Sequence, residues 1–174
     1  KPFQASVIGE KVSIAAGTKI WLSNAAGYIT IADDWTYVYK GNNTYVDATT
    51  EYTVTFSGNN ATVKVGGEKV TSKAVKIGEK VTFSVEVPEN YTLQSVSGAG
   101  VTDNGDGTYT TTTLFENVTV NIVVLDPVTV TFSGENATVK VDGVQVTSKT
   151  IKTGGSVMFT IETPTGYQVA SVKN

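Results

Sequence analysis

An internal repeat dominates this sequence and narrows the folds that are open to it. Residues 52–98 align with residues 128–174 at a constant offset of 76 positions without a gap, and 26 of the 47 aligned pairs are identical. Self-similarity at a fixed period is typical of arrays of like structural units. We therefore expect an aromatic-rich β region over 1–51, repeat 1 over 52–127, and repeat 2 over 128–174, which is incomplete at its C-terminal end.

The two repeats share their apolar positions more than their polar ones. Val85 is exchanged for Ile161, which preserves packing volume, whereas Glu89 is replaced by Thr165. A repeated catalytic site would show the opposite pattern, because catalysis depends on particular polar atoms. The repeat therefore predicts a structural, non-enzymatic unit without catalytic residues.

Alternation of apolar and polar residues predicts β-strands throughout the repeats. Val81, Phe83 and Val85 share one face of an extended segment, with Thr82 and Ser84 on the other. One apolar and one polar face is typical of antiparallel sandwiches. The expected strands of repeat 1 are 52–57, 60–65, 69–76, 80–87, 91–97, 108–113 and 118–124. We expect an all-β fold of tandem immunoglobulin-like (Ig-like) antiparallel β-sandwich domains.

The composition excludes much catalytic chemistry. There is no cysteine, histidine or arginine, since all 13 basic residues are lysines. Ser-His-Asp triads, cysteine nucleophiles, disulfides and His/Cys zinc sites are therefore excluded, and we expect no cofactor or metal. The net charge of −3 argues against nucleic acid as a partner. No apolar run approaches the roughly 20 residues of a membrane span.

Two stretches resemble a known class of repeat. They are Val81–Val96, with the pattern V-x-F-x-V-E-x-P-x-x-Y-x-V/L-x-S-V, and Asp103–Tyr109 followed by Asn117–Val120. Together they resemble the Ig-like β-repeats of bacterial or archaeal cell-surface proteins, and the resemblance covers residues 52–174. It implies an extracellular location and a role in the stalks of adhesins, S-layer-associated proteins or large secreted enzymes.

Aromatic residues gather in the N-terminal region. Trp35, Tyr37 and Tyr39 lie on one face of a predicted strand, and Trp21 lies in the same region. Exposed, these rings would form a flat carbohydrate-binding platform or an assembly contact. Buried, they would form the core of a small unit. We expect the core role and keep the platform as the alternative.

Two acidic segments are interpreted as turns. Asp103–Gly107 lacks the ligand spacing of a calcium loop, whereas its Asn-Gly and Asp-Gly pairs favour a hairpin turn. Asp33 and Asp34 are sequence neighbours, so on a strand they would point to opposite faces and would not converge. We expect a turn between Ile31 and Trp35.

Five Asn-x-Thr sequons are candidate glycosylation sites. They begin at Asn42, Asn60, Asn90, Asn117 and Asn136. In a threonine-rich chain such matches arise by chance, and the second and fifth recur because the repeat does. We expect them to be unmodified unless the source organism glycosylates its proteins.

Repeat 2 stops at Asn174, the counterpart of Gly98, so it lacks counterparts of residues 99–126. An unfinished sandwich has an unpaired edge and an open apolar groove. The expected groove residues are Val128, Val130, Phe132, Val157, Phe159 and Ile161. Three explanations stay open: the chain is a fragment of a longer protein, residues 1–50 close the sandwich, or a neighbouring copy donates a strand. Phe3, Ala5 and Val7 alternate as a donor strand should.

The sequence thus favours an extracellular structural protein at the cell surface, as a segment of a surface layer, stalk or self-assembling filament. Its expected partners are further copies of itself or neighbouring domains of the same surface protein. One alternative is a carbohydrate-binding or adhesin module that contacts polysaccharide through its aromatic region. Another is a set of accessory domains of a secreted glycoside hydrolase.

Overall fold

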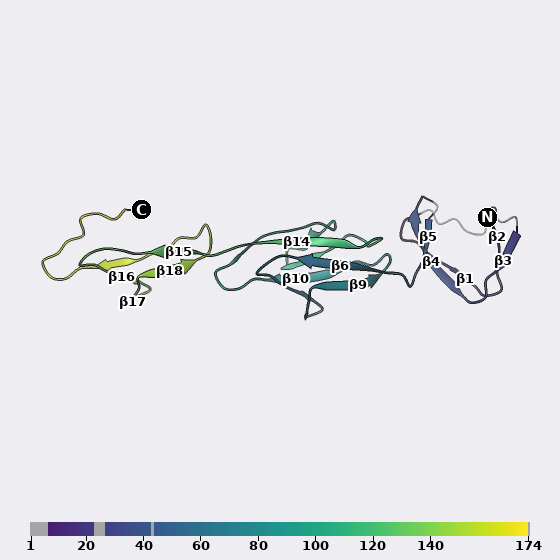
Figure 1. Ribbon diagram of the computed structural model, residues 1–174, viewed down its shortest axis with the longest axis horizontal. Helices are drawn as coiled ribbons and strands as arrows, with labels where there is room; N and C mark the ends of the chain where they lie inside the picture. Colours follow the sequence, from purple (N-terminus) through teal and green to yellow (C-terminus); the bar gives the residue numbers. More distant parts are fainter. Residues whose placement is uncertain (1–6, 23–26, 43, 174) are drawn as a thin grey trace. The chain divides into compact units, whose positions relative to one another are not determined.

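The computed structural model describes residues 7–22, 27–42 and 44–173, and every regular element among them is a β-strand (Figure 1). β-Branched residues supply about half of the strand positions, because their side chains pack well on a pleated surface. The prediction of an all-β fold is therefore confirmed.

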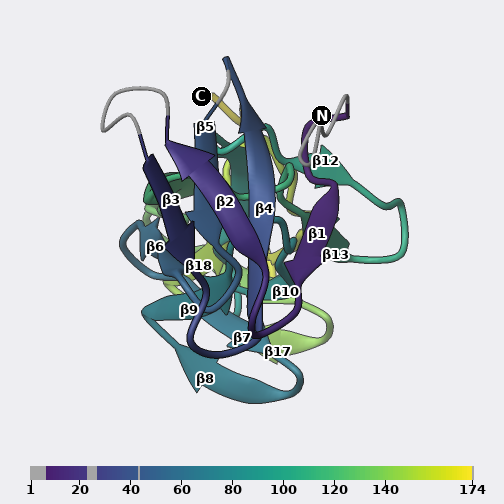
Figure 2. The same cartoon turned by 90° about the vertical axis from the view of Figure 1, so that its right-hand side faces the viewer.

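Five strands in two antiparallel sheets make up the N-terminal region: β1 (Lys11–Ile14), β2 (Lys19–Leu22), β3 (Gly27–Thr30), β4 (Trp35–Gly41) and β5 (Thr44–Asp47). One sheet has the order β1-β4-β5, with β4 in the middle (Figure 2), and β2 pairs with β3. Gly41 and Asn42 turn the chain from β4 to β5 at φ values of 95° and 48°. Glycine and asparagine tolerate such positive φ values, so these residues allow the hairpin.

Repeat 1 forms two sheets around a shared core. Its strands are β6 (Glu51–Ser57), β7 (Thr62–Val65), β8 (Glu68–Val70), β9 (Ser72–Lys76), β10 (Thr82–Glu86), β11 (Thr92–Ser97), β12 (Thr102–Asp103), β13 (Thr108–Thr110) and β14 (Val118–Leu125). One sheet has the order β12-β13-β10-β7-β8 and the other β11-β14-β6-β9. The rings of Phe56 and Phe83, one from each sheet, lie 4.8 Å apart between centroids. The two sheets therefore pack in a β-sandwich-like arrangement.

One predicted strand, 69–76, is divided between the two sheets. β8 pairs with β7 in one sheet, and β9 pairs with β6 in the other. The chain changes sheets at Thr71, whose carbonyl accepts a hydrogen bond from the Phe56 amide at 2.9 Å. Alternation alone could not reveal this corner, because the residues on both sides of it keep the strand pattern.

The last strand of repeat 1 lies parallel to the first. β14 pairs with β6 from Val118 opposite Val54 to Asn121 opposite Ser57, whereas β9 flanks β6 in the antiparallel direction. The expectation of a wholly antiparallel sandwich is therefore wrong at this pair. Because the chain reaches β14 by crossing from the opposite sheet, no hairpin fixes the direction in which β14 runs.

Repeat 2 contains five strands: β15 (Val128–Thr131), β16 (Thr138–Val141), β17 (Val144–Gln145), β18 (Ser148–Ile151) and β19 (Thr160–Glu162). β15 pairs with β18 as β6 pairs with β9, and β17-β16-β19 reproduces the order β8-β7-β10. The rings of Phe132 and Phe159 lie 5.0 Å apart, as their counterparts do in repeat 1. The shared sequence thus builds the same partial scaffold twice.

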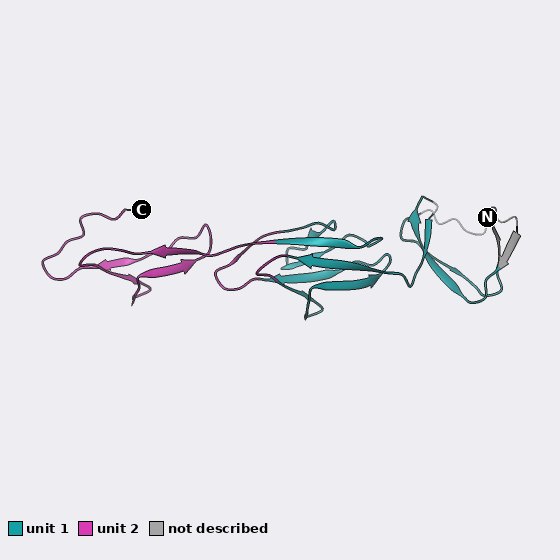
Figure 3. Cartoon of the chain, in the orientation of Figure 1, with its two compact units in different colours: residues 1–57, 62–86, 96–122 teal, residues 58–61, 87–95, 123–174 magenta. Residues whose placement is uncertain are grey.

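The chain forms two compact units, which Figure 3 colours separately. The first comprises residues 1–57, 62–86 and 96–122, and the second comprises residues 58–61, 87–95 and 123–174. The second unit therefore includes two internal segments of repeat 1 as well as all of repeat 2. The division of the compact units therefore differs from the sequence-based boundary between residues 127 and 128, because parts of repeat 1 belong to the second unit.

Gly98 provides a test of how closely β14 is held. A Cβ at Gly98 would lie 2.5 Å from the carbonyl oxygen of Thr119, and the φ of Gly98 is 87°. Gly67 is a matched control, because its φ is 88° and an added Cβ would meet nothing within 4 Å. Both alanine variants carry the cost of a positive φ, about 1–2 kcal/mol, but only Gly98→Ala must also displace β14.

We expect Gly98→Ala to lower the free energy of unfolding of repeat 1 by about 1–3 kcal/mol more than Gly67→Ala does. Urea unfolding of the intact chain, followed through the methyl resonances of repeat 1, measures both losses. Equal losses would show that β14 can move away from Gly98 without cost.

Candidate assembly interface

The sheets of repeat 2 end where those of repeat 1 continue. In repeat 1, β6 lies between β9 and β14, but its counterpart β15 has only β18 beside it among the strands that the structure describes. Likewise β10 lies between β7 and β13, but its counterpart β19 has only β16. Both sheets of repeat 2 consist of its own strands alone, so no described strand of residues 7–50 closes them. Among the described strands, β15 and β19 are therefore edge strands.

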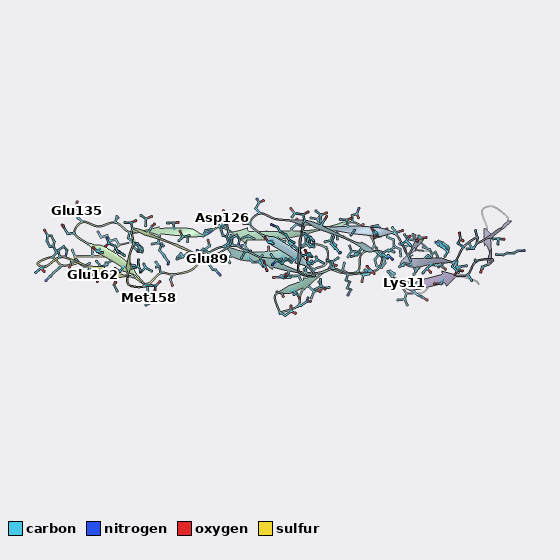
Figure 4. The ribbon with its side chains drawn as sticks, turned by 90° about the horizontal axis from the view of Figure 1, so that it is seen from below. Lys11, Glu89, Asp126, Glu135, Met158 and Glu162 are labelled. Carbon is cyan, nitrogen blue, oxygen red and sulfur yellow. The ribbon has the colours of Figure 1, made fainter. Side chains whose placement is uncertain are left out.

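The missing cover leaves apolar side chains of repeat 2 open to solvent. Phe83 is 2% exposed in repeat 1, whereas its counterpart Phe159 is 38% exposed. Met158 beside it is 89% exposed (Figure 4). Residues 92–97 form β11, but the segment 168–173 is not a strand, because β11 depends on β14 as its neighbour. Tyr167 and Val169, before and within this segment, are exposed.

The surface that receives β14 is identical in sequence in the two repeats. Residues 53–58 and 129–134 have the same sequence, Thr-Val-Thr-Phe-Ser-Gly. In repeat 1 these residues carry β14, with Val120 opposite Phe56. The amide of Thr53 also donates to the side-chain oxygen of Asn117 at 2.8 Å, just before β14 begins. Repeat 2 therefore keeps the same sequence, residues 129–134, at the edge of the pair formed by β15 and β18.

The second open edge, along β19, is less conserved. In repeat 1 the hydroxyls of Thr82 and Thr110 lie 2.9 Å apart, and Phe83 stacks on Tyr109 at 5.7 Å between centroids. Methionine replaces Thr82 at position 158, which removes the hydroxyl contact. The β15 edge is thus the better candidate for an interface.

The predicted aromatic residues form a continuous cluster on β4 and β5. The ring centroids of Trp35 and Tyr37 lie 4.9 Å apart, those of Tyr37 and Tyr45 4.8 Å, and those of Tyr39 and Tyr45 5.1 Å. Tyr37 is only 2% exposed, while its neighbours are half-buried. Burial raises the pKa of Tyr37, with further contributions from Tyr45 and Glu10. The buried central ring favours the core role over an open sugar platform.

Sequence reasoning missed Tyr45 and Asp47. Tyr45 lies opposite Tyr39 across the β4–β5 pair, and reading the register back through the turn at Gly41 would have placed it there. Asp47 accepts a hydrogen bond from the Trp35 indole N–H at 2.8 Å. The Thr49 hydroxyl, the Thr49 amide and this indole hold the pKa of Asp47 below its usual range. Asp47 thereby links the aromatic cluster to the turn after β5.

The structure says little about the other predicted contact residues, which are Trp21 and the donor-strand candidates. Trp21 lies in β2, but its side chain is outside the described residues. Of the donor-strand candidates, Phe3 and Ala5 also lie outside the described residues, and Val7 is 64% exposed. The structure thus brings Trp35, Tyr37 and Tyr39 together, while a role for residues 3–7 as a donor strand stays a prediction.

Each sequon asparagine has a structural role. Positive φ values occur at Asn42, Asn60, Asn90 and Asn136. Asparagine tolerates this conformation better than most residues. Residue 166, the counterpart of Asn90, is a glycine with φ 89°. The fifth, Asn117, bonds to the amide of Thr53. Backbone geometry thus accounts for four of the asparagines and a side-chain hydrogen bond for Asn117, while glycosylation stays a prediction.

Asp103–Gly107 is a turn, as predicted, and Asp33 and Asp34 lie in the bent connection between β3 and β4. Asp103 accepts from the Gly105 amide and Asp106 from the Thr108 amide, and this turn joins β12 to β13. The Thr108 hydroxyl and then its amide lower the pKa of Asp106. Asp34 accepts from the amide of Ala16 at 2.8 Å. Within the described ranges, no group of three or more acidic side chains is placed to hold a metal ion.

No protein-family model, curated protein or solved structure matches this chain. In the part of the chain that the structure describes, no helix has the length and apolar character needed to cross a membrane.

The paired phenylalanines offer an internal comparison of covered and uncovered cores. Phe83→Ala should lower the stability of repeat 1 by about 3–5 kcal/mol, because it removes a buried ring and leaves a cavity. Phe159→Ala should lower the stability of repeat 2 by no more than about 2 kcal/mol, because water already reaches this ring. Urea titration with residue-specific NMR measures each loss. Equal losses would contradict the difference in burial.

The lowered pKa of Asp47 predicts that the N-terminal sheet loses stability in acid. Its pKa is lowered in the folded chain, so the carboxylate stabilises the fold fully above its unfolded pKa, about 4. This contribution is lost as pH falls through the lower, folded pKa. Thermal unfolding between pH 7 and 2, followed by tryptophan fluorescence, should show the loss in the parent chain and not in Asp47→Asn. Asp106→Asn serves as the control, because Asp106 lies in repeat 1 and should leave this fluorescence profile unchanged.

Proposed function

We propose that this chain is an extracellular structural protein in which two Ig-like units form part of a surface layer, stalk or filament. The β6–β14 pair carries the proposal. The chain enters repeat 1 at β6 and leaves it at β14, and the two strands are parallel neighbours. Tension on the chain would pull them in opposite directions along their length, so their hydrogen bonds would be loaded together in shear. Such a unit suits a protein that bears load.

The features repeated along the chain serve its scaffold. Backbone positions with positive φ recur in register, at Asn60 and Asn136 and at Gly78 and Gly154. A cross-strand ion pair also recurs. Lys64 and Glu86 lie 2.7 Å apart, and so do their counterparts Lys140 and Glu162. Exposed pairs of this kind contribute little energy, so we assign them to keeping the outer face polar. The resemblance to surface-protein repeats supports the extracellular location.

Force spectroscopy on the intact chain, held at both ends between marker domains, tests this proposal. Repeat 1 should unfold in one event that releases about 250 Å of chain, and at a higher force than repeat 2, which lacks a counterpart of β14. Asn117→Ala should lower that force, because it removes the side-chain bond to Thr53. Unfolding of repeat 1 at or below the force that opens repeat 2 would contradict a load-bearing role.

Carbohydrate binding is the second candidate, because Trp35, Tyr39 and Tyr45 remain half-exposed. Trp35→Ala distinguishes the two roles of the cluster. We expect it to destabilise the N-terminal sheet, since it removes ring packing and the bond to Asp47. Loss of polysaccharide retention on an affinity gel with an unchanged melting temperature would instead establish a sugar platform.

A further inference from the structure

We infer that the N-terminal sheet docks on repeat 1 and that the two move as one rigid body. The contact is made by the face of β4 that carries Val38 and Lys40, which we call the docking face. The residues on both sides of this contact belong to the first compact unit, coloured teal in Figure 3. The inference goes beyond the load-bearing role, because it makes the joint between these two parts of the chain stiff.

Val38 is buried on a face of the sheet that is mainly polar. Alternation along β4 places Val38 on the side opposite to the aromatic cluster, between Thr36 and Lys40. Lys11 and Val46 lie opposite Val38 on the two neighbouring strands. On an uncovered sheet face the valine would be open to solvent, but it is 0% exposed. Another part of the chain therefore covers the docking face.

Repeat 1 supplies this cover. A Cβ built at Gly78 would lie 3.7 Å from Cγ1 of Val38, which is ordinary van der Waals contact. The Nζ of Lys40 lies 5.7 Å from the centroid of the Tyr52 ring, within the range of a cation–π interaction. An apolar contact and a charged contact thus lie next to each other on the docking face.

Two copies of one loop form the joint. The sequence Ile-Gly-Glu-Lys-Val occurs at residues 8–12 and again at residues 77–81. In each copy the glycine has a positive φ, 91° at Gly9 and 85° at Gly78, and its amide donates to a backbone carbonyl at 2.8 Å. In each copy the glutamate side chain also accepts from the amide three residues before it. The loop therefore has the same conformation in both places.

Each copy of the loop touches the other partner. The copy at 77–81 meets β4 of the N-terminal sheet, and the copy at 8–12 meets repeat 1, because a Cβ at Gly9 would lie 3.8 Å from Cζ of Phe115. The contacts are thus reciprocal, and a tilt of one partner relative to the other would break them.

The connection between the two partners is also held. Three residues, 48–50, join β5 to β6. The carbonyl of Thr50 accepts a hydrogen bond from the amide of Ile77 at 2.8 Å, and Ile77 is 0% exposed. A connection this short and bonded in this way does not act as a flexible linker. Docking therefore also fixes the direction in which the aromatic cluster, on the opposite face of β4, points from repeat 1.

Residual dipolar couplings of the intact chain test the inference. Amides of β1 and β4 and amides of β6 and β10 should fit one alignment tensor, because docked parts tumble together. Val38→Asp places a charge in the buried contact and should separate the partners, so the two sets should then need different tensors. Lys11→Asp is the matched control, because Lys11 lies opposite Val38 and is exposed. This control should keep the single tensor.

Phe115→Ala tests the contact from the side of repeat 1. Both tryptophans of the chain lie before residue 36, so their fluorescence reports the N-terminal region alone. Loss of the Phe115 ring should move the urea midpoint of this fluorescence to lower urea, because the sheet loses part of its support. Tyr91→Ala should leave this midpoint unchanged. Tyr91 is also a half-buried aromatic residue of repeat 1, but it lies in a segment of the second unit.

Different tensors for the two sets in the parent chain would overturn the inference, as would a single tensor in Val38→Asp. If Val38→Asp unfolds the N-terminal sheet, the fluorescence midpoint decides, and equal midpoints in Phe115→Ala and Tyr91→Ala would contradict docking. The force at which repeat 1 of the parent chain unfolds is a separate measurement, so the load-bearing role stands or falls independently.

Discussion

The parallel pairing of β14 with β6 is the interaction on which the described sandwich depends. It places Val120 and Ile122 in the core, each with about 1.5–3 kcal/mol of burial energy, and it gives β11 a neighbour. Repeat 2 shows the consequence of its absence, because 168–173 forms no strand and Phe159 is open to water. The same short sequence thus has two environments within one chain, and the difference is the presence of one strand.

Most of this architecture could be predicted from periodicity. The alternation in Val81–Val85 and Val118–Val124 placed β10 and β14 to within a residue or two, because strands with one buried face leave a regular pattern. The direction of β14 and the change of sheet at Thr71 could not be predicted. Both depend on how distant strands meet, and alternation records only which residues share a face.

The N-terminal region was harder to interpret. The spacing of Trp35, Tyr37 and Tyr39 indicated a shared face, and the structure confirms that their rings lie together. Whether that face was open or covered depended on Tyr45, which packs edge-on against Tyr37 from the neighbouring strand. The role of Asp47 depended on the position of Trp35 across the sheet. The register through the turn at Gly41 could have placed Tyr45, but the contact between Asp47 and Trp35 carries no local sequence signal and became visible only in the structure.

Native-state hydrogen exchange at four amides tests the central claim most directly. Thr53 and Thr55 in repeat 1 should exchange only through unfolding of the repeat, because β14 covers their side of β6. Thr129 and Thr131, in the identical sequence of repeat 2, should exchange orders of magnitude faster. The amides of Phe56 and Phe132 donate to Thr71 and Thr147 and provide the internal reference for bonded positions. Equal protection of Thr55 and Thr131 would contradict the claim that β14 distinguishes the two repeats.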